Sequence, residues 1–320
     1  MPGRKTVFMF SGQGSHYFHM ARPLFDQNEA FHPHMLRLDG MARQLSGVSV
    51  LEAMYAPTAS KADVFDRTRL THPAIFMVEY SLAHALMDAG VIPAMVLGTS
   101  LGSFAAACIA GMLDDEAALT AVIQQARALE AACPPGGMIA VLSDPALLAE
   151  DFLRTNSELA GINFATHFVV SAPQGSLAVI EAELARRNIT HQRLPVSLAF
   201  HSRWIDPGKD DFIALTRALA YRKPQLPLAC CARVTLLSAA PEAYFWEVAR
   251  QPIRFREMIA QLESSNDRYR YIDVGPAGTL ATFLKYGLEP TSQSTAHPIA
   301  TPFGQDQKNF AALVALKDSR

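Results

Sequence analysis

The sequence predicts an α/β fold with a mostly parallel sheet, interrupted by a small inserted subdomain. Strand-like apolar runs alternate with helical stretches over residues 1–129 and again over residues 199–320, a pattern typical of a parallel sheet covered by helices. Between them, over residues 130–198, the order becomes β-α-β-β-α-β, which is that of a ferredoxin-like unit. We therefore expect one large domain in two segments and a ferredoxin-like subdomain between them.

The first predicted elements flank a glycine-rich loop. Residues 6–10 form a short apolar run that we expect to be a buried strand, and Ser-Gly-Gln-Gly-Ser follows at 11–15. This loop could cradle a phosphate, but it lacks the Walker lysine and the full Rossmann spacing, so a nucleotide site is not favoured. Residues 20–56 are expected to form helices with polar breaks.

A strong helix is predicted over residues 75–87. Thr71 is expected to be its N-cap, Pro73 lies in the first turn, and Gly90 ends it. Residues 91–93 then lead into the next apolar run.

That run ends in the pattern Gly-x-Ser-x-Gly, formed by Gly98, Ser100 and Gly102. A small-residue run at 104–111 predicts a helix directly after it, so the context is the strand, sharp turn and helix of a nucleophile elbow. The glycines let the backbone crowd the serine, and the helix N-terminus can stabilise an oxyanion. The pentapeptide alone is equally compatible with an ordinary glycine-rich loop, because short motifs have many false positives.

The remaining elements follow from the same patterns. A helix is expected from Asp114 to about Ala132, after which Gly136 and Gly137 break the chain. The subdomain is predicted to contain strands at 138–142, 160–164, 167–171 and 191–197, with helices at 145–153 and 177–187. After it, we expect short strands at 228–232, 234–237 and 271–276, and helices at 244–250, 281–286 and 309–316.

Composition argues against several classes of function. The chain has 320 residues, 50% of them hydrophobic, and a formal net charge of −2, so nothing indicates binding to nucleic acid or to an anionic membrane. We expect no signal peptide at its start, no membrane span and no metal site, and therefore a cytoplasmic protein. Four cysteines lack the spacing of metal ligands or of a disulfide framework, and we expect them to be reduced thiols: Cys108, Cys133, Cys230 and Cys231.

A serine nucleophile needs a general base, and the chain has ten histidines. His201 is preferred because it follows a strand-like segment in the turn Ala-Phe-His-Ser. His72, which precedes the proline of a helix start, could line a pocket. His16, His167 and His191 are more typical of loops and surfaces, and spacing alone leaves the choice open.

Six short blocks together resemble one known family. The chain resembles the acyltransferase family of polyketide and fatty acid synthases, of the malonyl-CoA:acyl carrier protein transacylase type, over nearly its whole length. This resemblance implies an α/β-hydrolase-like large domain that carries a ferredoxin-like insert. The blocks are Phe-Ser-Gly-Gln-Gly-Ser (10–15), Thr-His-Pro-Ala (71–74), Gly-Thr-Ser-Leu-Gly (98–102), Ala-Phe-His-Ser (199–202), Pro-Ile-Arg-Phe (252–255) and Asp-Val-Gly-Pro (273–276).

The resemblance also implies roles for individual residues. Ser100 would attack a thioester carbonyl and become the acyl-enzyme, while His201 would take its proton and later activate the second nucleophile. The backbone N–H groups of Gln13 and Leu101 would form the oxyanion hole. A backbone carbonyl near Val248 would orient the histidine. No metal or organic cofactor would be needed, because the phosphopantetheine arm arrives with the substrate.

The chain departs from the family pattern in the acyl pocket. Thr99 and Ser103 replace the His and Glu of Gly-His-Ser-x-Gly-Glu, which we expect to change the pocket wall. Malonyl-using members carry an arginine on the next helix that holds the free carboxylate, and the ungapped position here is Gln125, which has neither the charge nor the paired donors. Arg127 lies about 200° further around the helix, unless a local gap brings it into register. Other expected pocket residues are His72, Leu198 and Phe200.

The missing arginine implies an acyl group without a carboxylate. The chain resembles acyl hydrolases that remove short, stalled acyl groups from acyl carrier proteins in trans-acyltransferase polyketide pathways. One alternative is a transferase that moves a malonyl or neutral acyl group from CoA to the carrier protein, and another is an idle scaffold that only binds the carrier protein. We expect a monomer, and the acidic carrier protein would meet basic residues near the cleft, for which the candidates are Arg203, Arg222, Lys223, Arg250 and Arg254.

Overall fold

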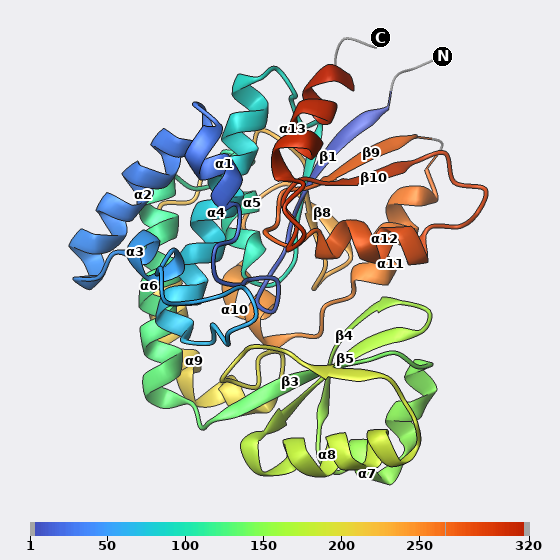
Figure 1. The fold of residues 1–320 in the computed structure, drawn as a ribbon. Helices are drawn as coiled ribbons and strands as arrows, with labels where there is room; N and C mark the ends of the chain where they lie inside the picture. The colour runs from blue at the N-terminus through green and yellow to red at the C-terminus, as the bar shows by residue number, and fades with distance from the viewer. Residues whose placement is uncertain (1–3, 266, 317–320) are drawn as a thin grey trace.

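The molecule contains two separate sheets, a large one and a small one (Figure 1). The computed structural model describes residues 4–265 and 267–316, so residues 1–3, at the start where no signal peptide was expected, lie outside it. The large sheet is mostly parallel and the small sheet is antiparallel. The prediction of an α/β fold with a separate antiparallel unit is confirmed.

The large sheet has the strand order β10-β9-β1-β2-β7-β8. All its neighbours pair in parallel except β7 and β8, which are antiparallel at one edge. Parallel strands covered on both faces are apolar throughout, and residues 7–10 are accordingly all buried. The strands are β1 (Lys5–Phe10), β2 (Met95–Gly98), β7 (Leu228–Cys230), β8 (Thr235–Leu237), β9 (Tyr269–Asp273) and β10 (Thr295–Pro298).

Helices cover both faces of this sheet. Alternate residues of β1 point to opposite faces and pack into two different hydrophobic cores. Phe8 and Phe10 belong to the main core, whereas Val7 and Met9 belong to a second core. The main core includes residues of α1 (Arg22–Gln27), α2 (Phe31–Ser46), α3 (Val50–Met54), α4 (Thr68–Asp88), α5 (Gly102–Ile109), α6 (Asp115–Ala132), η2 (Arg203–Gly208), α9 (Lys209–Arg217), α10 (Tyr244–Arg250) and α13 (Asp306–Ala315). The second core includes residues of α11 (Phe255–Glu263) and α12 (Thr279–Gly287).

The small sheet has the order β4-β5-β3-β6, the strand order of a ferredoxin-like unit, and α8 packs on its core. Its last strand is shorter than predicted because Pro195, just beyond it, has no N–H to donate. The elements are β3 (Gly136–Val141), η1 (Pro145–Ala149), α7 (Asp151–Arg154), β4 (Glu158–Phe164), β5 (His167–Pro173), α8 (Gln174–Arg186) and β6 (His191–Arg193).

Helix α4 begins at Thr68 and not at residue 75, so the predicted start is wrong. Thr71 is not the N-cap; it is buried within the helix, and its hydroxyl oxygen accepts a hydrogen bond from Gln13. Pro73 lies beyond the first turn. The start was predicted too late because proline is favoured in the first turn of a helix. Here the helix begins before Pro73, and Thr68, Thr71 and His72 in this added part are buried.

Four elements were not predicted: η2, α9, α11 and β10. Helix α11 carried a clear signal, because its buried residues have the spacing i, i+3, i+4, i+7 of an amphipathic helix: Phe255, Met258, Ile259 and Leu262.

Ile253, in the large domain just before α11, pairs with β4 of the small sheet. Its N–H donates to the carbonyl of Ala160 at 2.8 Å, and its carbonyl accepts from the N–H of Ile162 at 3.1 Å. These bonds hold β4 against the large domain. The cysteines form no disulfide, and within the described ranges no helix has the length and apolar character needed to cross a membrane.

Candidate active site

Ser100 lies in the turn between β2 and α5. Its φ is +51°, in the left-handed region that residues with a side chain rarely adopt. A Cβ on Gly98 would lie 2.6 Å from Cα of Ser103, and a Cβ on Gly102 would lie 2.3 Å from the carbonyl oxygen of Ser11. Close backbone approach therefore requires both glycines, and the turn has the geometry of a nucleophile elbow.

His201 is hydrogen-bonded to this serine, although 101 residues separate them in the chain. Its Nε2 lies 2.9 Å from Oγ of Ser100, and its Nδ1 lies 2.8 Å from the carbonyl oxygen of Gln251. A carbonyl can only accept, so Nδ1 carries the proton and Nε2 is free to accept the serine hydroxyl. This is the arrangement of a nucleophile and its general base.

The carbonyl that orients His201 belongs to Gln251, so the prediction of Val248 is wrong. Val248 lies inside α10, and it lines the small cavity beside Ser100. Gln251 is the first residue after that helix and has an extended backbone, with φ −80° and ψ 153°. Its carbonyl is thus outside the helical pattern and available to the imidazole.

Burial sets the charge state of the histidine. It lowers the pKa of His201 from 6.5 to about 4; the hydrogen bond to Gln251 works against this shift, and the charge of Arg250 adds to it. The imidazole is therefore neutral at neutral pH, which is the form that can accept a proton.

Gln13 and Leu101 flank the serine, and both line the small cavity with it. Neither of their backbone N–H groups has a hydrogen-bond acceptor among the described residues, so both are free to donate. The loop at 11–15 packs directly on the elbow, since a Cβ on Gly12 would lie 2.9 Å from Cβ of Ser100. The side chain of Gln13 is fixed by a 2.9 Å bond from Nε2 to Oγ1 of Thr71. This arrangement can offer two donors to an oxyanion.

Glu79, in α4, holds the same loop and was missed by the sequence analysis. Its Oε1 accepts from the backbone N–H of Ser11 at 2.6 Å and from the Ser11 hydroxyl at 3.0 Å. Burial raises the pKa of Glu79 well above 4.5; the bonds from Ser11 oppose the shift, and the carboxylate of Asp273 adds to it. Burial therefore favours the protonated form of this carboxyl group. A single acidic residue in the apolar run 75–87 was the signal that could have identified it.

A small cavity lies beside Ser100, between α4, α5, α6 and α10. Its volume is about 10 Å³, roughly the space that one water molecule needs. None of the described residues that line it is Lys, Arg, Asp or Glu. They are Gln13, His72, Ser100, Leu101, Phe104, Gln125, Leu129, Phe200, Phe245, Val248 and Ala249.

Gln125 lines this cavity and is 2% exposed. Arg127 is exposed on another side of α6 and donates to the carbonyl of Leu45 at 3.1 Å, which excludes the register that would bring it into the pocket. Burial lowers the pKa of His72 from 6.5 to about 3, and His16 lowers it further. With His72 neutral, the described wall holds no cation for a carboxylate.

Of the four other predicted pocket residues, only two line the small cavity or the larger cleft that leads to Ser100. Phe200 lines the small cavity and the larger cleft, whereas Thr99 lines the cleft alone. Ser103 and Leu198 line neither, so the prediction is wrong for these two. Ser103 is buried against Gly98 at the start of α5, and Leu198 is buried in the main core.

The larger cleft, of about 270 Å³, leads to Ser100 and His201. One wall comes from the loop at 11–15 and the elbow, and the other comes from β3, β4 and β5 of the small subdomain. His167 lines it and bonds Asn163 at 3.0 Å. The remaining candidate bases bond elsewhere, His16 with the carbonyl of Pro195 and His191 with that of Ile189.

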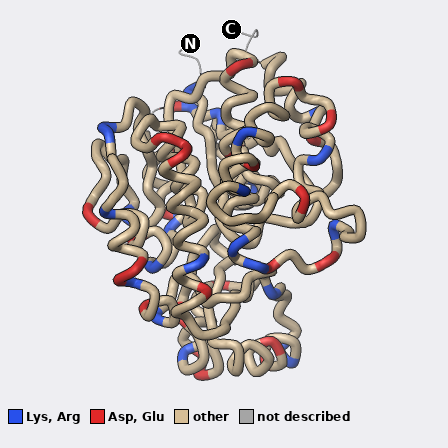
Figure 2. Tube along the Cα trace, turned by 90° about the vertical axis from the view of Figure 1, so that its left-hand side faces the viewer, with Lys and Arg blue, Asp and Glu red and all other residues tan. Residues whose placement is uncertain are grey.

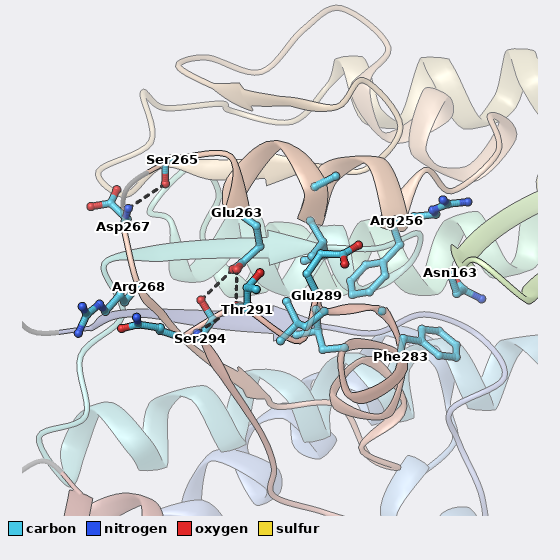
Figure 3. A pocket seen from close by; sticks show the side chains of 18 residues that line it. Asn163, Arg256, Glu263, Ser265, Asp267, Arg268, Phe283, Glu289, Thr291 and Ser294 are labelled. Carbon is cyan, nitrogen blue, oxygen red and sulfur yellow. Dashed lines mark hydrogen bonds between the residues drawn. The ribbon is translucent and has the colours of Figure 1, made fainter.

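A third cavity, of about 600 Å³, adjoins this cleft and shares Asn163 and Phe283 with it (Figure 3). Glu263 accepts hydrogen bonds there from the hydroxyls of Ser292 at 2.6 Å and Ser294 at 2.8 Å. Across the part of the chain that the structure describes, no cluster of three or more His, Cys, Asp or Glu side chains could hold a metal. The third cavity thus borders the cleft, and neither Ser100 nor His201 lines it.

Four of the five predicted rim cations are in ion pairs. Figure 2 shows basic and acidic positions interspersed over the side that it presents. Exposed pairs of this kind neutralise each other and contribute little free energy. The pairs are Arg203–Glu158, Arg222–Asp114, Arg250–Asp206 and Arg254–Glu257, and Lys223 has no ion pair among the described residues.

Comparisons with known proteins agree with this geometry. The sequence profile of the acyl transferase domain matches residues 7–318. PksD of Bacillus subtilis, named a polyketide biosynthesis acyltransferase homolog, is 42% identical over 305 residues, which are 95% of this chain and 94% of that protein. BaeD of Bacillus velezensis, with the same description, is 42% identical over 308 residues, or 96% of this chain and 95% of that protein.

A solved structure is similar over the whole length. The acyltransferase domain from the second module of the salinomycin polyketide synthase superimposes with a TM-score of 0.84 at 28% identity. The match covers 100% of this chain and 74% of that one.

Proposed function

This chain belongs to the acyl transferase domain family, and from that premise we propose that it is an acyl hydrolase of polyketide biosynthesis. Its substrate is an acyl carrier protein that bears a short, non-carboxylated acyl group as a thioester, and its role is to clear stalled groups. The observation that carries the proposal is the uncharged cavity beside Ser100, with Gln125 in its wall.

The acyl-enzyme forms by nucleophilic catalysis. His201 Nε2 takes the hydroxyl proton as Ser100 Oγ bonds to the thioester carbonyl carbon. The N–H groups of Gln13 and Leu101 donate to the oxyanion. When the C–S bond breaks, the imidazolium returns its proton to the sulfur, and the pantetheine thiol leaves. Gln251 holds the ring in the required tautomer throughout.

Hydrolysis repeats these steps with water. His201 takes a proton from a water molecule, whose oxygen bonds to the ester carbonyl carbon. The C–O bond to Ser100 then breaks, the serine recovers its proton from the imidazolium, and the free acid leaves. Transfer differs in this half only, because a carrier-protein thiol takes the place of water.

The polarity of the cavity supports a neutral acyl group. A carboxylate moved from water into a buried site without a cation costs several kcal/mol, about a hundredfold or more in affinity. A glutamine offers one amide donor group and no charge, and His72 is neutral at physiological pH. Malonyl is therefore a poor substrate, whereas acetyl and other neutral groups avoid this cost.

The second candidate is a transferase that moves an acyl group from CoA to the carrier protein. It is favoured by the names of PksD and BaeD, which are acyltransferase homologs. Those names also support polyketide biosynthesis as the setting. An idle scaffold is disfavoured by the 2.9 Å contact between Ser100 and His201, which a binding role would not need.

Intact-mass measurement on both proteins tests the proposal. Acetyl-loaded and malonyl-loaded carrier protein are each mixed with the enzyme, and the enzyme is separately mixed with malonyl-CoA. We expect the acetyl group to be lost as acetate and the malonyl group to be retained.

Ser100→Ala is the control and should show neither loss nor adduct. A stable malonyl adduct on Ser100 that passes to unloaded holo carrier protein would instead identify a malonyltransferase.

A further inference from the structure

Two side chains that line the small cavity beside Ser100 carry polar atoms without partners. Both ring nitrogens of His72 and Oε1 of Gln13 are buried and make no hydrogen bond within the described residues. Gln125 lines the same cavity and is 2% exposed, and its amide is a further polar group in the wall. Buried polar groups are nearly always paired, so this cluster indicates a polar ligand.

The chemistry of these groups defines what they can bind. Oε1 of Gln13 can only accept, a neutral imidazole has one donor and one acceptor, and an amide has both. A hydroxyl group donates once and accepts twice, and therefore complements this set. A methyl group complements none of them, and a carboxylate lacks both a proton to donate and a cation to meet.

The size of the cavity limits where that hydroxyl can be. At about 10 Å³ it holds little more than one water-sized group, so the hydroxyl must lie within one or two bonds of the carbonyl carbon. We propose that the cavity selects a 2-hydroxyacyl group, with glycolyl as the smallest member. This inference rests on the proposed acyl-enzyme at Ser100 and adds the chemical class of its acyl group.

Glycolyl and propionyl thioesters provide the test, because they have the same shape and differ by a hydroxyl in place of a methyl. Each is supplied as its N-acetylcysteamine thioester, and kcat/KM is divided by the alkaline hydrolysis rate of the same compound to remove the difference in intrinsic reactivity. We expect the corrected value for glycolyl to exceed that for propionyl about tenfold or more, since sites built to bind a hydroxyl discriminate strongly against its absence.

Two variants link the preference to the cavity. Gln125→Leu should bring the corrected ratio to within about twofold of unity, because an apolar wall no longer rewards the hydroxyl. Gln124→Leu, at the exposed position next to it, should keep the wild-type ratio. His72→Leu is measured in parallel, in case Gln125→Leu fails to fold, and should have the same effect.

A corrected ratio near or below unity in the wild type, or a ratio unchanged in a folded Gln125→Leu protein, overturns the hydroxyacyl assignment. If acetyl carrier protein is still hydrolysed in that case, the proposed function survives. If no thioester acylates Ser100, both proposals fail together.

Discussion

Ser100 and His201 are both held in the left-handed backbone region, with φ of +51° and +59°. Such conformations cost on the order of 1–3 kcal/mol each and persist only where neighbouring contacts enforce them. For His201 these contacts include its N–H bond to the carbonyl of Ala249 at 3.0 Å and its ring bond to Gln251 at 2.8 Å. The pair is thus aligned before substrate arrives, and strain is located at the residues to which we assign chemistry.

The pKa of His201 makes a prediction for the pH profile. Because this pKa is lowered to about 4, kcat/KM for acetyl thioester should rise with pH through about 4 and be level by pH 6. A histidine with the ordinary pKa of 6.5 would instead give a rise centred near pH 6.5. The same shift gives folding stability that is present above pH 6.5 and is lost as the pH falls toward 4, because the unfolded chain takes up the proton first. Circular dichroism at each pH separates loss of activity from unfolding, and an acid limb near 6.5 in folded protein contradicts the account.

Gln125→Arg should convert the acyl preference. A guanidinium in the cavity wall can form two charge-assisted bonds to a carboxylate, so formation of the malonyl adduct on Ser100 should increase about tenfold or more. Acetyl turnover should fall, because the cation is left without a partner. The adduct is quantified by intact mass, with Gln124→Arg as the exposed control. A folded Gln125→Arg protein that gains no malonyl adduct would contradict the placement of Gln125.

At the scale of elements, the elbow depends on β1, β2 and α5 meeting closely. A Cβ on Gly102 would lie 2.3 Å from the carbonyl oxygen of Ser11 and 2.4 Å from that of Phe10, and backbone atoms cannot move aside separately. Gly102→Ala should therefore lower the free energy of unfolding by about 3 kcal/mol or more. Gly40→Ala, in the middle of α2 with open space around it, should raise it by about 1 kcal/mol. Urea titration compares the two, and equal effects would contradict the close packing.

Glu79 connects α4 to the loop at 11–15, and the preference of its carboxyl group for the protonated form can be tested. Glu79→Gln keeps an oxygen that accepts from Ser11 and has nearly the same shape, so kcat/KM and thermal stability should change little. Glu79→Leu removes the acceptor and leaves the Ser11 N–H buried without a partner, which costs about 1–3 kcal/mol. It should lower kcat/KM at least tenfold by loosening Gln13. If Glu79→Gln is as damaging as Glu79→Leu, the group is ionised and its role differs.

Local signals in the sequence account for most elements. The elbow helix and α10 follow from periodicity and turn residues, and α11 was missed although its apolar spacing is regular. The start of α4 was misplaced because proline usually marks a first turn, whereas packing of the preceding residues on the core decides the boundary here.

At the scale of the whole molecule, the site lies where chain segments far apart in sequence meet. Residues 11–15, the elbow, His201 and Ile253 all line the cleft, and the small subdomain forms its other wall. The order of the sequence motifs predicted Ser100 and His201, which lie within the blocks 98–102 and 199–202. Gln125 was predicted by counting along the chain from Ser100 without gaps. The sequence did not predict Gln251 or Glu79, because the roles of these residues depend on where a helix ends and on what a buried side chain touches.

The partitioning of a preformed acetyl-enzyme tests the central claim most directly. The enzyme is acetylated on Ser100, freed of excess reagent, and mixed in a single turnover with either buffer or holo carrier protein. We predict that acetate forms at the same rate in both and that the carrier protein gains little acetyl. Faster loss of acetyl from Ser100 in the presence of the carrier protein, with most of the acetyl found on its thiol, would contradict hydrolysis and identify a transferase.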